Sequence, residues 1–279
     1  MKKNFLVFCC IWLVSSCVGK STLDEKVQKD LSPIWAEYFQ DHFDETKAVE
    51  VIVATNRKAK NSSFGCSENS FSVTADSVTK FGVCKINVPK NHAVGEIPLA
   101  KDNRQSSRDY FKTLESKSLE FEDLITKIQT SKRMPLVFVH GFNVRFEEAV
   151  LRAAQIAYDL KYQGPIILFT WPAGSGDGFF EQNFLNKTYE NNLLTAKASV
   201  AIFKKFLSDL SSQDIKINLM VHSMGHQVVL PALKEISEAE VKKTAINQLI
   251  LNAPDFAVKD FRQMVKNIKK LSDKTTLYC

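Results

Sequence analysis

A regular alternation of apolar and amphipathic segments from residue 135 onward constrains the fold more than any other feature. Short apolar runs of strand length are separated by longer segments with apolar residues at helical spacing. The apolar runs span residues 135–140, 165–171, 215–221, 246–252 and 275–279, and the helical segments span 146–160, 188–210, 257–271 and a stretch that begins at Met224. Strands that alternate with helices form a mostly parallel sheet covered on both faces. The sequence therefore predicts an α/β fold.

The preceding part of the chain predicts strands over 49–57 and 81–89, with a Ser- and Asn-rich loop or hairpin between them. Residues 107–131 carry apolar positions at helical spacing and predict a helix. We therefore expect one domain over 49–279, with an amino-terminal β part (49–134) and an α/β core (135–279). A polar linker and a short helix around Trp35–Phe43 fill residues 17–48.

Residues 1–16 have the features of a signal peptide. Lys2 and Lys3 are basic, and an apolar run of about ten residues follows, too short to span a bilayer. The next residues, Val14-Ser15-Ser16-Cys17, resemble a bacterial lipoprotein signal, in which the cysteine is lipidated and becomes the first residue. This predicts a chain anchored through Cys17 to a membrane of the cell envelope. The alternative is an ordinary secretory signal cleaved near Ser16.

The remaining composition excludes several classes of function. The net charge is only +6, and no basic stripe is interleaved with aromatic residues, so nucleic-acid binding is not expected. No cluster of His, Cys, Asp or Glu has metal-ligand spacing, and neither a metal nor a cofactor is expected. The stretch PAGSGDG (172–178) lacks the Lys-Ser/Thr of a phosphate loop and is interpreted as a flexible loop near the mouth of the active site. Outside the cytoplasm, Cys66 and Cys84 could pair as a disulfide or remain two buried thiols.

Ser223 is the candidate nucleophile, because it lies where a predicted strand gives way to a predicted helix. A sharp turn at this junction is the setting of the G-x-S-x-G nucleophile elbow. Gly225 supplies the small residue that the crowded turn needs, although Val221 is larger than the expected glycine. The backbone N–H of Met224 would help to bind an oxyanion.

A second motif, His140-Gly141-Phe142, follows the first strand of the core. In α/β hydrolases the loop after this strand supplies the other oxyanion N–H, which would here be that of Phe142. Gly141 would allow a close approach of the backbone, and His140 is expected to order the loop. His222 is expected to pack against the sheet, because neighbouring side chains at an elbow point apart.

Several of these segments together resemble one family of bacterial α/β hydrolases. They are FVHGFNVRFEEAVLRAAQIAYDL, ILFTWPAGSG, INLMVHSMGHQVV, INQLILNAPDF and, nearer the amino terminus, ATNRKAKNSSFG and FGVCKINVPKNHAVGEI. The chain from about residue 49 onward is similar to the family known as DUF900, and this resemblance implies a lipase or esterase. Ala173, His226 and Pro231 depart from the family pattern; Pro231 should kink the helix after the elbow.

The catalytic base is the open question, because the triad of α/β hydrolases follows the chain order Ser, acid, His. His226 is the only histidine after Ser223, and it would reach the hydroxyl only through an unusual geometry. Asp255 is the candidate acid, with an N-cap of the next helix as the alternative, and Asp273 lies at the opposite edge of the predicted sheet. The sequence ends at Cys279 within the last predicted strand, which indicates a truncated member with the last strand or strands missing.

Two functional hypotheses follow. The first is a serine hydrolase of the bacterial envelope that acts on a small-molecule or lipid ester. Its base is His226 or a residue of another chain. The second is an inactive, truncated relative that persists as a binding lipoprotein or has no role.

Overall fold

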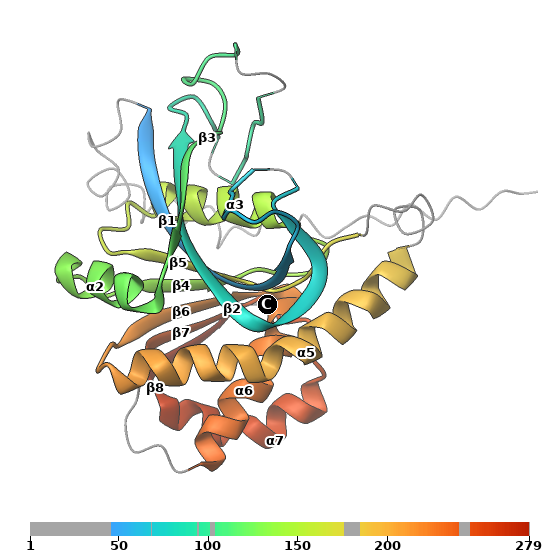
Figure 1. Ribbon diagram of the computed structural model, residues 1–279. Helices are drawn as coiled ribbons and strands as arrows, with labels where there is room; N and C mark the ends of the chain where they lie inside the picture. Colours follow the sequence, from blue (N-terminus) through green and yellow to red (C-terminus); the bar gives the residue numbers. More distant parts are fainter. Residues whose placement is uncertain are drawn as a thin grey trace, which may run out of the picture. The chain divides into compact units, whose positions relative to one another are not determined.

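A single eight-stranded sheet organises the part of the chain that the structure describes (Figure 1). The computed structural model describes residues 46–67, 69–93, 95–100, 104–175, 185–239 and 246–278; the predicted signal, Cys17 and the linker helix lie outside these ranges. The strand order is β3-β2-β1-β5-β4-β6-β7-β8. The neighbouring pairs β1–β5, β5–β4, β4–β6, β6–β7 and β7–β8 are parallel, whereas β1–β2 and β2–β3 are antiparallel. The predicted mostly parallel α/β sheet is therefore confirmed.

The elements have the following bounds. The strands are β1 Lys47–Ala59, β2 Phe71–Val88, β3 Lys112–Leu119, β4 Leu136–Val139, β5 Ile166–Thr170, β6 Ile217–His222, β7 Ile246–Asn252 and β8 Ser272–Tyr278. The helices are α2 Phe121–Ser131, α3 Phe146–Asp159, α5 Leu185–Ser212, α6 His226–Glu238 and α7 Val258–Ile268, with short 3₁₀ turns η1 Ser223–Gly225 and η2 Lys269–Leu271.

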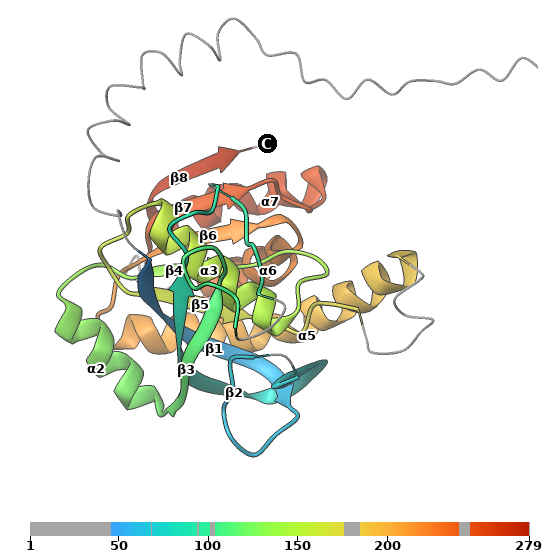
Figure 2. The same ribbon diagram turned by 90° about the horizontal axis from the view of Figure 1, so that it is seen from above.

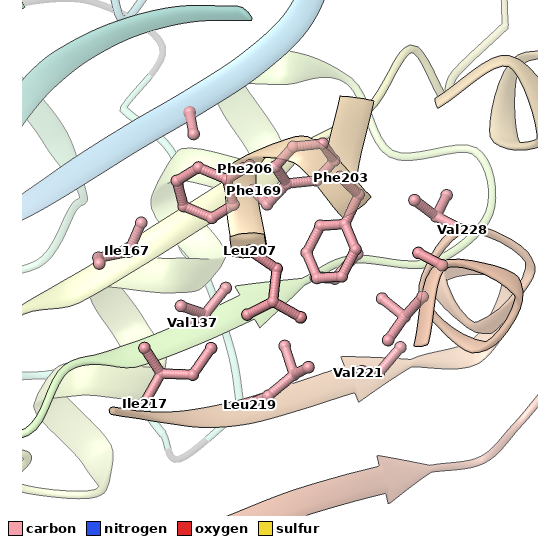
Figure 3. Close-up of a cluster of buried hydrophobic side chains, with 14 of the residues drawn as sticks. Val137, Ile167, Phe169, Phe203, Phe206, Leu207, Ile217, Leu219, Val221 and Val228 are labelled. Atoms are coloured by element: carbon pink, nitrogen blue, oxygen red, sulfur yellow. The ribbon is translucent and has the colours of Figure 1, made fainter. Parts of the chain in front are cut away.

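Most of the helices cover one face of the sheet. Alternate residues of the central strands, among them Val137, Ile167 and Leu219, point to this face and are buried. Aromatic residues of α5 pack on them, and Figure 3 shows Phe203 and Phe206 above the strands. Helices α2, α6 and α7 contribute to the same core. The period-2 alternation explains why these strands are continuously apolar: each side chain is buried on one face or the other.

Helix α3 covers the opposite face and lies alone there among the described helices (Figures 1 and 2). Its alanine-rich side packs on the other set of strand residues, such as Phe138 and Leu168. Helix α3 covers β2, β1 and β5, and it shares a core with buried residues of β4. A cavity of about 780 Å³ lies between α3 and β6, lined by residues such as Leu151 and Met220.

The predicted helix over 107–131 is wrong in its first half. Residues Lys112–Leu119 form the edge strand β3, and only Phe121–Ser131 is helical. Glu120 begins the helix, with its backbone N–H donating to the side chain of Asp123 in a capping box. The strand forms because β2 is long enough to offer its backbone edge to it, a long-range pairing that local spacing cannot reveal.

The Ser- and Asn-rich segment connects β1 and β2 as an antiparallel hairpin. Its loop is tied back to β2 by a disulfide between Cys66 and Cys84, whose Cα atoms are 5.8 Å apart. Both cysteines are buried. Elsewhere, α6 runs through Pro231, which lies inside the helix rather than ending it.

Candidate active site

The site lies where the path of the chain reverses direction across the sheet. From β4 the chain passes through α3 to β5 on one side, whereas from β6 it passes through α6 to β7 on the other. Because β4 and β6 are neighbours in the sheet, the loops that follow them diverge and leave a crevice at the carboxyl ends of the strands. The segments after these two strands, residues 140–145 (the oxyanion loop) and 223–225 (the elbow), face each other across it.

The elbow has the strained backbone that a nucleophile elbow requires. Ser223 adopts φ +48°, in the left-handed region that non-glycine residues rarely occupy. A Cβ placed on Gly225 would lie 2.6 Å from the carbonyl oxygen of His140. A Cβ placed on Gly141 would lie 2.8 Å from Cβ of Ser223. The two glycines therefore allow the oxyanion loop and the elbow to touch.

His226 contacts the backbone of the elbow and not the hydroxyl group of Ser223, which a catalytic base must reach. Its Nδ1 lies 2.6 Å from the carbonyl oxygen of Ser223, and because a carbonyl only accepts, Nδ1 carries the proton. Its Nε2 is buried and has no hydrogen-bond partner among the described residues. Burial lowers the pKa of His226 to about 4, against smaller opposing effects of the Ser223 carbonyl and Asp255, so the ring is neutral at pH 7. The hydrogen bond from Nδ1 therefore stabilises the turn at the elbow.

Asp255 lies beside the elbow. Its backbone N–H donates to the carbonyl of Ser223 at 3.3 Å, and its own carbonyl accepts from Gln227 at 2.8 Å. The hydroxyl of Tyr189 on α5 donates to the Asp255 carboxylate, with oxygen–oxygen distances of 3.0 and 3.2 Å. Burial and this carboxylate raise the pKa of Tyr189. The N-cap of α7 is Ala257, so the N-cap alternative for Asp255 is wrong.

His140 is buried at the start of the oxyanion loop. Its Nδ1 lies 3.0 Å from the carbonyl oxygen of Gly141 and its Nε2 lies 2.8 Å from Oγ1 of Thr170. The ring stacks on Trp171, whose indole N–H donates to the His140 carbonyl at 3.0 Å. Burial, and next the charge of Arg57, lower the pKa of His140 to about 3. A neutral ring with both nitrogens engaged cannot serve as a base for Ser223.

His222 lines the cavity between α3 and β6, where its ring is partly shielded although the residue keeps solvent-accessible surface. Burial and the nearby Arg152 lower its pKa. His92 binds Asp159 and the carbonyl of Pro89. Asp273 of β8 pairs with Lys216, which directly precedes β6. Among the described histidines, no ring is hydrogen-bonded to the hydroxyl of Ser223.

The backbone N–H groups of Phe142 and Met224, which directly follow Gly141 and Ser223, remain the predicted oxyanion donors. The Met224 side chain is buried in the core under the sheet's main helical layer, and the Phe142 ring packs on Tyr189 with centroids 5.6 Å apart. The N–H of the next loop residue, Asn143, donates to the buried side chain of Asn192 at 3.1 Å.

Sequence reasoning missed four polar residues that surround the site: Arg57, Thr170, Tyr189 and Asn192. Arg57 carried a signal, since it stands at the end of an apolar strand (VEVIVATNR) where a charge is costly unless it is paired. The others carried none, because a polar residue in a helix or at a strand end is ordinary.

Among the described residues, no group of three or more His, Cys, Asp or Glu side chains could hold a metal ion. No helix in the same residues has the length and apolar character that crossing a membrane requires.

Comparison with known proteins places the chain in a family. Residues 116–279, more than half of the chain, match the family model described as alpha/beta hydrolase of unknown function (DUF900). No curated protein and no solved structure matches the chain. The family match covers β4, the oxyanion loop, the elbow and Asp255, and it agrees with the observed sheet. The chain belongs to the DUF900 family of α/β hydrolases.

Proposed function

We propose that the protein is a serine hydrolase that uses Ser223 to cleave an ester of a small molecule or a lipid. The observation that carries this proposal is the strained conformation of Ser223, at φ +48°, in a turn that packs directly against Gly141. Strain of this kind costs of order 1–3 kcal/mol, persists only where the surrounding structure enforces it, and clusters at active sites.

In the proposed reaction, the Ser223 hydroxyl attacks the ester carbonyl and a tetrahedral intermediate forms. The backbone N–H groups of Phe142 and Met224 donate to its oxyanion. Collapse of the intermediate expels the alcohol and leaves an acyl-enzyme, which water then hydrolyses to release the acid. Asp255 is the proposed acid of the triad.

The proton of Ser223 must pass to a base. His226 could accept it only after its ring left the carbonyl of Ser223, because Nδ1 is occupied and Nε2 is buried. We therefore propose two sources for the base: His226 in a rearranged elbow, or a histidine of another chain.

Labelling with a fluorophosphonate tests the nucleophile. The wild-type protein should be labelled, and Ser223→Ala should abolish the label. Ser212→Ala, which changes an exposed helix-end serine on α5, should leave it unchanged. A folded wild-type chain that takes no label would contradict the proposal and support the alternative of a binding protein.

The variant His226→Gln distinguishes between the two proposed sources of the base. If His226 is the base, labelling should fall by several orders of magnitude, as expected for loss of a triad member. If another chain supplies the base, labelling should depend on protein concentration and survive in the variant.

We also propose that Cys17 is lipidated and anchors the protein in the bacterial envelope. The support is the signal-like segment Val14-Ser15-Ser16-Cys17. Radiolabelled palmitate should be incorporated into the wild-type protein in bacterial cells and not into Cys17→Ser. Equal incorporation into both would exclude the anchor.

A further inference from the structure

We propose that Arg57 of β1 is a positioning residue for the oxyanion loop, residues 140–145. The inference rests on the proposed function, because the loop matters to catalysis only if Phe142 donates to an oxyanion. Arg57 lies outside the residues that match the family model, 116–279. It is fully buried, it contacts the end of the loop directly at Val144, and it reaches the beginning of the loop only through Thr170 and His140.

The guanidinium group of Arg57 donates three hydrogen bonds in three directions. Nη2 donates to the carbonyl of Val144 at 2.8 Å, near the end of the oxyanion loop. Nη1 donates to the carbonyl of Ala173 at 2.7 Å, and Nε donates to Oγ1 of Thr170 at 3.0 Å. One planar group thus fixes the positions of two loops and the end of β5.

Thr170 extends the hydrogen-bond network of Arg57 to the beginning of the oxyanion loop. Its single hydroxyl group accepts from Arg57, so its proton is free to point to Nε2 of His140, 2.8 Å away. Because Nε2 accepts, His140 carries its proton on Nδ1 and donates it to the carbonyl of Gly141. The donors and acceptors therefore run in one direction from Arg57 to Gly141. Phe142 lies between Gly141 and Val144, the two points that the chain of bonds holds.

A lysine could not replace Arg57 in this role. An ammonium group is a compact donor on a flexible stem. The three acceptors around Arg57 instead lie in the directions that the fixed N–H groups of a planar guanidinium take. Burial lowers the pKa of Arg57 to about 9, and the nearby carboxylates of Glu147 and Glu148 favour its charged form. The charge is retained at pH 7.

The test compares Thr170→Val and Arg57→Lys with the wild type. Thr170→Val keeps the shape of the side chain and removes only the hydroxyl that joins Arg57 to His140. The matched control is Ser199→Ala on α5, which removes an equally buried hydroxyl that accepts a hydrogen bond from Asn56 of β1. Hydrogen–deuterium exchange is followed in peptides that cover residues 140–146 and, separately, the elbow at 221–227.

In both variants, exchange in 140–146 should accelerate about tenfold or more, whereas exchange at the elbow should stay within twofold of the wild type. Ser199→Ala should change neither. The rate constant for fluorophosphonate labelling should fall roughly 10- to 100-fold in both variants, because the loss of one oxyanion donor costs on the order of 10²–10³. Reversible binding of the probe should weaken less than the labelling step.

Unchanged exchange in 140–146, or acceleration spread evenly over the fold as in a merely destabilised protein, would overturn the role of Arg57. The exchange result does not depend on turnover. If the wild type takes no label, the proposed function fails while exchange still decides whether Arg57 holds the loop. If the wild type is labelled and both variants are labelled at the same rate, the inference about Arg57 fails alone.

Discussion

At the scale of single residues, the site depends on two glycines that let the oxyanion loop touch the elbow. The sequence predicts Gly225 because the turn at the elbow is crowded, and Gly141 because the backbone must approach closely there. The structure adds what they face: Ser223 Cβ for Gly141, and the carbonyl oxygens of His140 and Val139 for Gly225. Arg57 shows the limit of this reasoning, since the acceptor of its Nη1 lies 116 residues further along the chain.

Gly141→Ala should displace the oxyanion loop from the elbow, because the new methyl group would lie 2.8 Å from Cβ of Ser223. We expect a loss of about 1–3 kcal/mol in the free energy of unfolding, as for other overpacked cores, and a large loss of fluorophosphonate labelling. Urea unfolding and labelling kinetics measure the two effects. Gly95→Ala is the control: its Cβ meets no atom within 4 Å, so it should strain the backbone at φ +89° without changing labelling. Wild-type labelling in Gly141→Ala would show that the loop does not contribute an oxyanion donor.

At the scale of elements, the strands and helices after residue 135 were predictable, because their apolar spacing reflects burial on a sheet or on one side of a helix. β3 was not, since its residues are largely exposed and pair with an edge. The β1–β2 hairpin was predicted only as one of two alternatives, and its disulfide as one of two states of the cysteines. The geometry that joins Cys66 to Cys84 exists only once β1 and β2 have paired.

Removal of the disulfide should destabilise this hairpin and the domain with it. The bond closes a loop between residues 18 positions apart, for which the chain-entropy model gives about 3 kcal/mol. Cys66→Ser with Cys84→Ala should therefore lower the midpoint of thermal unfolding, measured by circular dichroism. The wild type in reducing agent should match the double variant, and the double variant should not respond to the reductant. A wild-type midpoint that reducing agent leaves unchanged would mean that the two thiols are free.

At the scale of the whole molecule, stability should fall on acidification because two buried histidines are neutral in the folded state. The pKa of His140 is lowered to about 3 and that of His226 to about 4, from 6.5 in an unfolded chain. The unfolded chain therefore binds more protons below pH 6.5. The stabilisation from each neutral ring is complete above that pH and is lost as the pH falls toward the folded-state value.

Each histidine should contribute at most about 1.4 kcal/mol per pH unit to this loss. Urea unfolding at pH 7, 6, 5 and 4.5 measures it, and His140→Gln should give a shallower dependence than the wild type by about one proton. Ser199→Ala, which removes no titratable group, should keep the wild-type slope. An unchanged slope in His140→Gln would show that the ring is not the buried neutral group described above.

The sequence by itself determined the α/β class, the succession of strands and helices after residue 135, and the elbow at Ser223. These follow from periodicity and turn chemistry, which act between residues close together in the chain. Only the tertiary structure decided that β5 and β6 flank β4, that β3 is a strand, that His226 braces the elbow with its Nε2 buried, and that Arg57 reaches the oxyanion loop. Each of these depends on contacts between segments far apart in the chain, and those partners come together only when the segments pack.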